Sequence, residues 1–582
     1  MRIAALRRKI FGNKTSLLLT SIIIGLLASG CAVILKNGVH LIRYWVHFAS
    51  ESFPLLLFIF PTLGILLTAI YTQVVRKGDL GRGVTNIIYC ISRRDSYVQK
   101  DKMYSQMLTS ILTVGFGGSA GLEAPSASTG SAFGSNLASW LGFNQKERTL
   151  LLACGAAAGI SAIFNAPIAG VVFAFEILLV DKPLPLVVPL LISSATAALL
   201  SPLINSAQPF VLITQPWHSA NLFHYLIFAV IAAFLSVYAI RAYFYFGDLL
   251  ARSKQPYLRA IVGGLFLGGL IFLFPPLYGE GYESVLNILQ QQPAQLLADS
   301  LISGNSQVWV LIVFTLALMF LKVIATALTV GAGGNGGMFG SSLFTGAMCG
   351  YSFAHIVNTL GLGHLNEVNF TVIGMAALMS GIIHTPLTAI FLIAEITGGY
   401  ALFVPLMLTC SVSFLISRYF EPFSVYTKKL AMKGDLIASD KDKVLLAKMK
   451  LKNYIETNFV AFNETDKVAD IIKQISTLEH RDFFPVLNSK RQLVGLMPFQ
   501  KIGSIIFSDQ PYNDVYVKEI MSAPKALLNK TDSMETVLKS FDEYNVQVLP
   551  VIDGGEFVGF VSKSNIYTNY RRELIHEAEI PA

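Results

Sequence analysis

The sequence predicts a multispanning α-helical membrane protein made of two related halves, followed by a smaller soluble unit of helices and strands. Three observations lead to this fold class. The chain is 53% hydrophobic and only 14% charged, which is too apolar for a soluble protein of 582 residues. Two glycine-rich motifs recur in corresponding positions of the apolar part. After Ala431 the composition changes to that of a soluble protein.

The first apolar run, from Ser16 to Leu35, follows a basic N-terminus. A signal peptide can start in this way, but the run is too long for a signal sequence and many more apolar segments follow. We therefore interpret it as the first membrane helix, with its basic N-terminus in the cytoplasm. Several later apolar segments are shorter than the roughly 20 residues needed to cross the hydrocarbon, which indicates helices whose ends are buried in protein.

A glycine-rich break at residues 117–125 holds one carboxylate, Glu123, between two apolar segments. An ionisable group at membrane depth is costly, and it is kept mainly where it works on a transport pathway. The glycines let backbone N–H groups approach a ligand closely, and Pro125 suits the first turn of a helix. The N-terminus of that helix would favour an anion. The alternative is a helix–helix turn in which Glu123 only caps the next helix.

The same pattern occurs twice. GGSAGLEAP at residues 117–125 is matched position for position by GGNGGMFGS at residues 333–341. The segment from Pro167 to Glu176 has a counterpart, with equal spacing, from Pro386 to Glu395. The copies lie roughly 215–220 residues apart, as expected of two related halves. Paired glycine-interrupted segments point to a binding site at the membrane midplane, so we expect the two glycine loops to converge around one anion.

These motifs resemble the CLC family of chloride channels and chloride/proton exchangers. GLEAP stands where the family commonly has G-[KR]-E-G-P, and GGMFGS stands where it has G-G-[IVL]-F-x-P. The resemblance covers nearly the whole chain. It implies a CLC-type fold of two inverted halves in a lipid bilayer, forming a homodimer with one pore per subunit. It further implies the inner (plasma) membrane of a bacterium, with both termini in the cytoplasm.

The resemblance also implies a site for chloride, the transported ion. Glu123 would be the gate, because its ionised carboxylate would compete with chloride for the outer part of the site. The groups that replace the hydration shell of the ion would come from Gly121, Leu122, Met338, Phe339 and the hydroxyl of Tyr426. Two other interpretations of the last position stay open. Phe423 takes it if the alignment slips, and Tyr426 would otherwise be an interfacial tyrosine.

Arg82 departs from the family pattern. It stands in Gly81-Arg82-Gly83, where the family often has a serine whose hydroxyl donates to chloride. Arg82 would either supply a fixed positive charge at the inner mouth, or point toward the cytoplasmic vestibule and leave backbone N–H groups to hold the ion. We favour the second interpretation, because a fully desolvated arginine is expensive.

Ile177 bears on proton coupling. Exchangers of the best-known kind carry a proton-handling glutamate at this position, whereas channels of the family usually carry an apolar residue. The neighbouring Glu176 and its mate Glu395 are interpreted as structural carboxylates that cap backbone groups, and His384 as a satisfied helix-cap residue rather than a proton relay. The sequence therefore favours a gated chloride channel over a chloride/proton antiporter with a water-mediated inner proton route.

Other functional classes lack support in the sequence. The net charge of +8 comes from scattered residues and does not indicate nucleic-acid binding, and the five cysteines have no metal-ligand spacing. The motifs hold no catalytic constellation, so we expect a protein that is not an enzyme. A cation transporter would need acidic residues along its pore. A fluoride exchanger is conceivable because the serine is missing, but the chloride branch fits the other motifs better.

The soluble region contains a second repeat. Strand-like Phe483–Leu487 and Leu493–Leu496 match Val548–Ile552 and Phe557–Phe560, each after an amphipathic helix. This order resembles a tandem pair of CBS domains. We expect a transport domain at 1–430, a linker at 431–450, and CBS domains at 451–508 and 514–575. Ser562 and Asn565 match the adenine-nucleotide signature only loosely, so nucleotide binding stays open beside a purely structural or dimer-stabilising pair.

Overall fold

The computed structural model describes residues 13–53, 55–78, 80–81, 83–93, 96–179, 187–204, 215–297, 300, 308–433, 449–475, 483–506 and 514–570. The chain divides into two compact units, residues 1–436 and residues 437–582. In its described part the first unit is helical, whereas the second contains two small sheets. This agrees with the predicted change of composition after Ala431.

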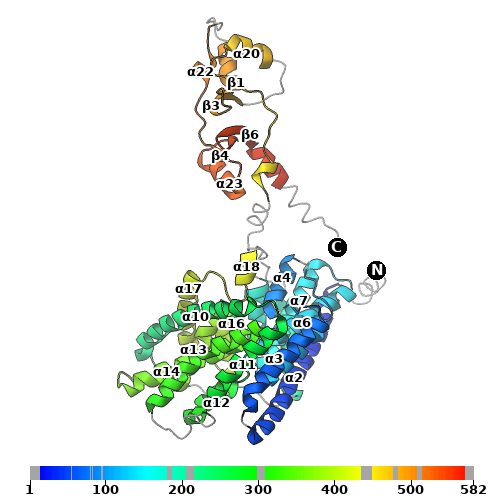
Figure 1. Cartoon of the computed structure of the whole chain (residues 1–582), viewed down its shortest axis with the longest axis vertical. Helices are drawn as coiled ribbons and strands as arrows, with labels where there is room; N and C mark the ends of the chain where they lie inside the picture. The colour runs from blue at the N-terminus through cyan, green and yellow to red at the C-terminus, as the bar shows by residue number, and fades with distance from the viewer. Residues whose placement is uncertain are drawn as a thin grey trace. The chain divides into compact units, whose positions relative to one another are not determined.

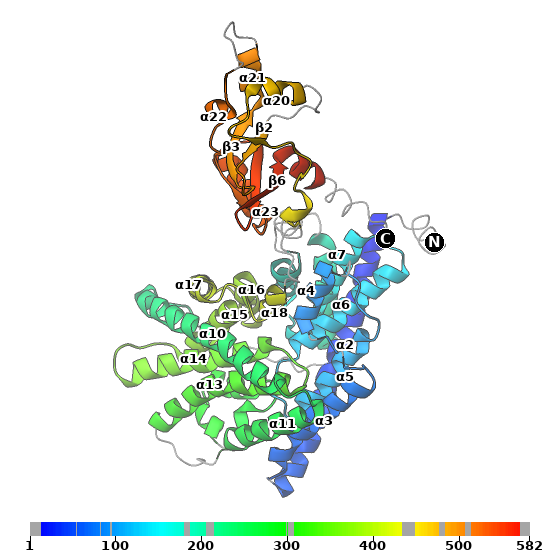
Figure 2. The same cartoon turned by 45° about the horizontal axis from the view of Figure 1, so that its top comes forward.

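The membrane unit consists of two sets of helices. The first set is α2 (Asn13–Ser52), α3 (Leu56–Val74), α4 (Gly83–Arg93), α5 (Lys102–Gly115), α6 (Glu123–Trp140), α7 (Gln145–Phe164), α8 (Pro167–Phe173) with η1 (Ala174–Leu178), and α9 (Val187–Ile204). The second set is α10 (Leu222–Ala251), α11 (Pro256–Leu273), α12 (Tyr282–Leu289), α13 (Val308–Ala332), α14 (Met338–Thr359), α15 (Glu367–Ile383), α16 (Pro386–Ile396) and α17 (Phe403–Phe420), followed by α18 (Lys428–Lys433). Figures 1 and 2 show the first set, in blue to cyan, beside the second set, in green.

The two sets pack in the same pattern, which confirms the predicted relation between the halves. In the first set α2 contacts α5, α7 and α9, and α7 contacts α6, α8 and α9. In the second set α10 contacts α13, α15 and α17, and α15 contacts α14, α16 and α17. The helices named here therefore have counterparts with corresponding neighbours in the other half.

Close packing of α6 on α7, and of α14 on α15, depends on small residues. Gly130 and Gly134 of α6 lie against the α7 backbone, where a Cβ atom would collide with carbonyl oxygens. Gly346 and Gly350 of α14 lie in the same way against the backbone of α15. Small residues four apart allow such approach between membrane helices, where dispersion contacts supply much of the association energy.

Helix lengths are uneven, as the short apolar segments predicted. Seven of the described helices are long and apolar enough to cross a membrane. By contrast α4 has 11 residues, α8 has 7 and α16 has 11. The first helix extends well beyond the predicted run from Ser16 to Leu35, because α2 continues to Ser52 over 40 residues. The short helices place helix termini inside the protein, where they can serve a ligand.

The second unit contains two copies of one motif. The first copy has β1 (Phe462–Asn463), α20 (Val468–Ile475), β2 (Phe483–Leu487), β3 (Leu493–Pro498) and α21 (Phe499–Ile506). The second has α22 (Val517–Ile520), β4 (Leu528–Asn529), α23 (Met534–Glu543), β5 (Val548–Asp553) and β6 (Glu556–Ser562). In each sheet the first strand pairs parallel to the second and the second pairs antiparallel to the third. The predicted repeat is confirmed.

The segment that precedes each repeat in the chain packs on the sheet of the other repeat. Met449 and Leu451 belong to the core of the second sheet, and Val517 and Ile520 belong to the core of the first. The exchange covers open strand edges: the backbone of Glu456 pairs with Phe560 of β6, and that of Ser522 pairs with Leu496 of β3. The ranges 451–508 and 514–575 thus describe the repeats along the chain, while the packed units also use these exchanged segments.

Candidate functional site

The two glycine loops meet inside the membrane unit. The N–H of Gly121 donates to the carbonyl of Gly337 at 2.9 Å, and the N–H of Gly337 donates to the carbonyl of Gly121 at 2.9 Å. Helix α14 begins directly after Gly337 and helix α6 begins two residues after Gly121, so their N-termini lie near one another. The convergence predicted from the repeated motifs is confirmed.

Matching threonines hold the loops. The hydroxyl of Thr329 accepts from the N–H of Ser119 at 3.0 Å, and the hydroxyl of Thr113 accepts from the N–H of Asn335 at 3.0 Å. Each hydroxyl therefore holds the loop of the other half. Gly117, with φ at 107°, takes a left-handed conformation that favours glycine, which explains why the loop begins with this residue.

Glu123 is the first residue of α6, and its side chain is 0% exposed. Its Oε2 accepts from the N–H of Gly340 at 3.2 Å, and its Oε1 accepts from the hydroxyl of Tyr282. The Gly340 N–H lies in the first turn of α14, where N–H groups have no partner within the helix. Glu123 thus reaches across to the helix N-terminus of the other half, which goes beyond capping its own helix.

The counterpart of Glu123 in the second loop is Phe339. Met338 and Phe339 open α14 and are both buried. The Phe339 ring stacks on Phe164 with centroids 5.6 Å apart. Leu122, just before α6, is also buried. The structure therefore brings together Gly121, Leu122, Met338 and Phe339 around Glu123, whereas Arg82 lies outside the described residues.

Tyr426 lies inside the protein and is 5% exposed, whereas Phe423 is 41% exposed. The Tyr426 hydroxyl has no hydrogen-bond partner among the residues that the structure describes. The hydroxyl of Thr85 donates to the Tyr426 carbonyl at 3.0 Å and so helps to fix its backbone. This burial argues against an interfacial tyrosine and leaves the Tyr426 hydroxyl able to donate to a ligand.

Two cavities approach the glycine loops without being lined by Glu123. The first, which we call the inner cavity, has a volume of about 480 Å³ and is lined by Gly83, Ala124, Met338, Tyr426, Lys429 and Lys433, among others. The second, which we call the outer cavity, measures about 250 Å³ and is lined by Lys36, Arg43, Leu122, Glu280, Tyr282 and Glu283, among others. Lysines make the inner cavity attractive to anions.

Several charged residues near Glu123 are not predicted by the sequence motifs. Lys36 of α2 and Lys322 of α13 both interact electrostatically with Glu123 and with Glu280. Lys322 donates to the carbonyl of Gly279 at 2.8 Å and thereby fixes the segment that carries Glu280. The signals in the sequence were a lysine in the middle of each of these two apolar helices and the stretch Gly279-Glu280-Gly281 between two helices.

Glu176 and Glu395 each cap the N-terminus of a short helix in the opposite half. Glu176 accepts from the N–H of Leu387 at 2.9 Å and from that of Thr388 at 2.8 Å, at the start of α16. Glu395 accepts from the N–H groups of Ile168 and Ala169 at 2.8 Å each, at the start of α8. Their interpretation as structural carboxylates that cap backbone groups is confirmed.

His384 ends α15 in a left-handed conformation, with φ at 65°. The position at a helix end is as predicted, but the side chain is not satisfied, because its buried Nε2 has no partner among the described residues. Its counterpart Asn165 ends α7 in the same conformation, with φ at 55°. Histidine and asparagine tolerate the left-handed conformation better than most residues do. We therefore interpret His384 and Asn165 as residues that end their helices by adopting this backbone conformation.

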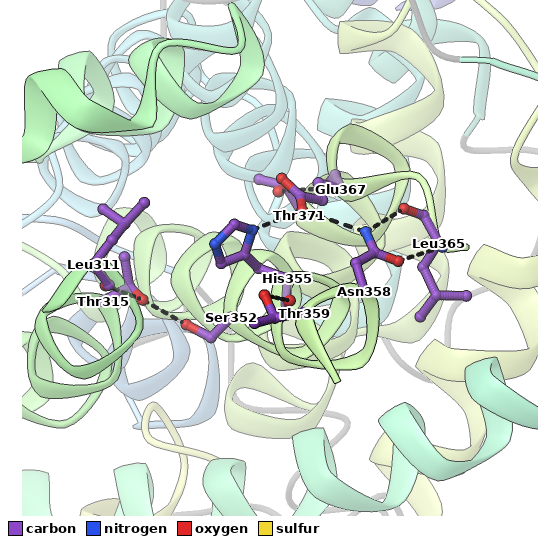
Figure 3. A network of polar contacts seen from close by, with 9 residues as sticks. All are labelled: Leu311, Thr315, Ser352, His355, Asn358, Thr359, Leu365, Glu367 and Thr371. Atoms are coloured by element: carbon purple, nitrogen blue, oxygen red, sulfur yellow. Dashed lines mark hydrogen bonds and ion pairs between the residues drawn. The ribbon is translucent and has the colours of Figure 1, made fainter. Parts of the chain in front are cut away.

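A separate polar network, drawn in Figure 3, joins α14 to α15. Nδ1 of His355 lies 2.7 Å from Glu367, and the Asn358 amide donates to the carbonyl of Leu365 at 2.9 Å. The Asn358 amide also donates to Glu367 at 3.3 Å. These contacts tie the C-terminal end of α14 to the start of α15, so we interpret them as structural.

In the soluble unit, the two residues of the loose nucleotide signature contact the protein itself. The hydroxyl of Ser562 donates to Glu456 at 3.0 Å, and the amide of Asn565 donates to the same oxygen at 3.4 Å. Glu456 belongs to the exchanged segment that covers β6. A carboxylate of the chain therefore occupies the donors that a ligand hydroxyl would use.

Comparison with known proteins places this geometry in a family. The voltage gated chloride channel model matches residues 63–418, and the CBS domain model matches residues 517–571. The chain is 30% identical over 386 residues to a putative ClcB-like chloride channel protein of Ralstonia nicotianae, covering 64% of this chain and 85% of that protein. It is 28% identical to a voltage-gated ClC-type chloride channel, ClcB, of Escherichia coli, covering 49% of this chain and 66% of that protein.

Solved structures show the same fold. A slow cyanobacterial Cl⁻/H⁺ antiporter superposes with a TM-score of 0.62 at 22% identity, over 72% of this chain and 97% of that one. A eukaryotic CLC transporter superposes with a TM-score of 0.62 at 16% identity, over 97% of this chain and 99% of that one. The matched range 63–418 contains both glycine loops, Glu123 and the exchanged caps. The chain is a membrane-spanning member of the voltage-gated chloride channel (CLC) family, with a C-terminal CBS domain.

Proposed function

We propose that the protein is a gated chloride channel in which Glu123 is the gate. One observation carries this proposal: a fully buried carboxylate occupies an N-terminal N–H group of α14, in the region between two cavities. A carboxylate and a chloride ion compete for such donors, because both are anions that helix N-termini attract. The transport of chloride agrees with membership of the CLC family.

In this proposal chloride enters the inner cavity past Lys429 and Lys433. Deeper in, the Tyr426 hydroxyl, which has no partner among the described residues, replaces part of its hydration shell. The N–H groups of Met338 and Phe339 and the loop around Gly121 and Leu122 replace the rest. Ionised Glu123 blocks the next step outward. Protonation of Glu123, or its displacement by chloride, releases the Gly340 N–H and opens the path.

Proton coupling is expected to be absent or substoichiometric. Ile177 cannot carry a proton. The carboxylate of the adjacent Glu176 already accepts hydrogen bonds from two N–H groups at the N-terminus of α16. A proton could reach Glu123 from inside only along water, and an apolar constriction resists that. The position of Ile177 beside Glu176 thus favours the channel over the antiporter with a water-mediated proton route.

The test is the reversal potential of the full chain in planar bilayers under opposed chloride and proton gradients. A pure chloride conductance reverses at the chloride equilibrium potential at every pH. A reversal potential that shifts steadily with the proton gradient would instead show an antiporter. Proteoliposomes loaded with chloride provide a parallel measurement, in which a pH electrode records whether protons move uphill.

We also propose that the protein is a homodimer with one pore per subunit, in the bacterial inner membrane, with both termini and the CBS pair in the cytoplasm. The family membership and the basic N-terminus support this arrangement. Light scattering of the detergent-solubilised protein would give the mass of the dimer. A monomer that retains chloride flux would contradict it.

For the CBS pair we propose a structural role over nucleotide binding. The contacts of Ser562 and Asn565 with Glu456 support it, because a ribose would have to displace this carboxylate. Calorimetric titration with AMP and ATP should show no binding by the full-length protein, whereas Glu456→Ala should expose the two donors. Micromolar binding by the unmodified chain would contradict the proposal.

A further inference from the structure

The outer cavity ends at a backbone N–H group of the first glycine loop. Leu122 lines this cavity, and its N–H donates to Oε1 of Glu280 at 3.2 Å. Leu122 directly precedes Glu123, so this donor lies next to the gate at the entrance of α6. A side-chain carboxylate of the protein therefore already occupies a backbone donor that an anion from the outer cavity could use.

Glu280 is in contact with the outer cavity, whereas Glu123, the proposed gate, is not. Glu280 lines the outer cavity, whereas Glu123 is 0% exposed. Tyr282, two residues after Glu280, also lines this cavity and donates its hydroxyl to Glu123. The segment 280–282 thus lies between Glu123 and the outer cavity, and it presents one carboxylate, that of Glu280.

Charged groups from several elements face Glu280. Lys36 of α2 and Lys322 of α13 attract its carboxylate, and Glu123 of α6 repels it. His40 and Arg43 of α2, with Tyr278 and Glu283 of its own segment, line the same cavity. Arg43 is paired with Glu283. Within the described residues, the charges that act on the Glu280 carboxylate are those of Glu123, Lys36 and Lys322, so two carboxylates and two lysines balance when all four are ionised.

We propose that Glu280 is a second gating carboxylate, which closes the outer entrance by occupying the N–H of Leu122. The inference rests on the proposed function, since it assumes that chloride passes this donor. A chloride ion added beside the balanced charges would leave one uncompensated negative charge. A proton taken by Glu280 from water in the outer cavity removes that excess, and the protonated side chain releases the Leu122 N–H to the ion.

This arrangement makes two protonation events relevant to opening. Low pH protonates Glu280 at the cavity and Glu123 behind it. The two carboxylates interact electrostatically, so protonation of one changes the protonation of the other. Removing the charge of Glu280 should therefore increase chloride flux at high pH and shift the remaining pH dependence, while Glu123 still provides a gate.

Chloride efflux from proteoliposomes, with equal pH on both sides, tests the proposal over a pH series. Glu280→Gln should raise efflux at high pH by about fivefold, because a neutral amide binds the Leu122 N–H more weakly than a carboxylate does. Calorimetry should show tighter chloride binding by the same variant. Glu280→Asp keeps the charge but shortens the reach, so efflux should rise while a steep pH response remains.

Glu283→Gln is the matched control. It makes the same chemical change in the same cavity, but Glu283 pairs with Arg43 and not with Leu122. Its pH profile should follow that of the unmodified protein. If Glu280→Gln, or Glu280→Asp where the first variant does not fold, also follows the unmodified profile, the proposal is wrong. If the unmodified protein releases no more chloride than empty liposomes, the proposed function itself fails and the second gate with it.

Discussion

The two halves of the membrane unit carry one pair of matching glutamates and one glutamate whose counterpart is apolar. Glu176 and Glu395 are counterparts, and each caps the helix N-terminus of the opposite half with two backbone hydrogen bonds. Glu123 and Phe339 are also counterparts, but only one is ionisable. Glu123 binds the N-terminus of α14, whereas Phe339 stacks on Phe164.

This difference distinguishes residues that hold the fold together from a residue that we expect to control transport. Both halves must build the same contacts to pack in the same way, so the residues that make those contacts occur twice. Glu123 lies at a position where only one half carries an ionisable group, and its counterpart Phe339 packs against another aromatic ring instead. Paired carboxylates should therefore affect stability, while the unpaired one should affect gating.

The largest effect is expected for Glu123→Gln. The amide mimics the protonated carboxyl and cannot ionise, so chloride efflux should continue but lose most of its pH dependence. Efflux from proteoliposomes between acidic and neutral pH measures this, with Glu283→Gln as a control that keeps the normal response. A steep pH response that persists in the double variant Glu123→Gln with Glu280→Gln would place the gate elsewhere.

A loss of stability is expected for Glu176→Ala and Glu395→Ala, and to a similar extent in both. Each change removes charge-assisted hydrogen bonds to a helix N-terminus, worth about 1–3 kcal/mol. The melting temperature of the detergent-solubilised protein, followed by intrinsic fluorescence, should fall in both variants. Their efflux should keep its normal pH profile. A changed pH profile in only one of them would contradict the symmetric role.

A smaller effect is expected for Tyr426→Phe. The hydroxyl has no described partner within the protein, so its removal should leave the melting temperature unchanged. Chloride binding measured by calorimetry should weaken by about fivefold, the value of one hydrogen bond to an ion. Tyr351→Phe is the control, because its hydroxyl is likewise buried without a described partner but belongs to the middle of α14. Equal chloride affinities in both variants would exclude Tyr426 as a ligand.

The smallest effect is expected for Arg82→Ser, which restores the common family residue. We expect a modest change of anion selectivity or unitary conductance, because a guanidinium held beside a mobile ion would be costly to bury. Single-channel recording in chloride and bromide measures it. Bromide density directly on the Arg82 guanidinium in a crystal would show instead that this residue forms the central site.

Much of the architecture follows from the sequence alone. Composition and apolar segments identified the membrane unit, and the repeats at residues 117–125 and 333–341 predicted that two loops converge. Repeated motifs determine this because related halves of a membrane protein meet at matching positions. The single carboxylate in the first loop was sufficient to identify Glu123 as the candidate gate.

Only the tertiary structure decided what surrounds that gate. Lys36, Glu280 and Lys322 lie far from Glu123 in the sequence and belong to no repeated motif, so their electrostatic contacts with it appear only after the helices pack. The same holds for Glu456 in the CBS pair, which reaches Ser562 through an exchanged segment. A sequence specifies which residues are ionisable, but the distance between charges, and hence their interaction, is set by the fold.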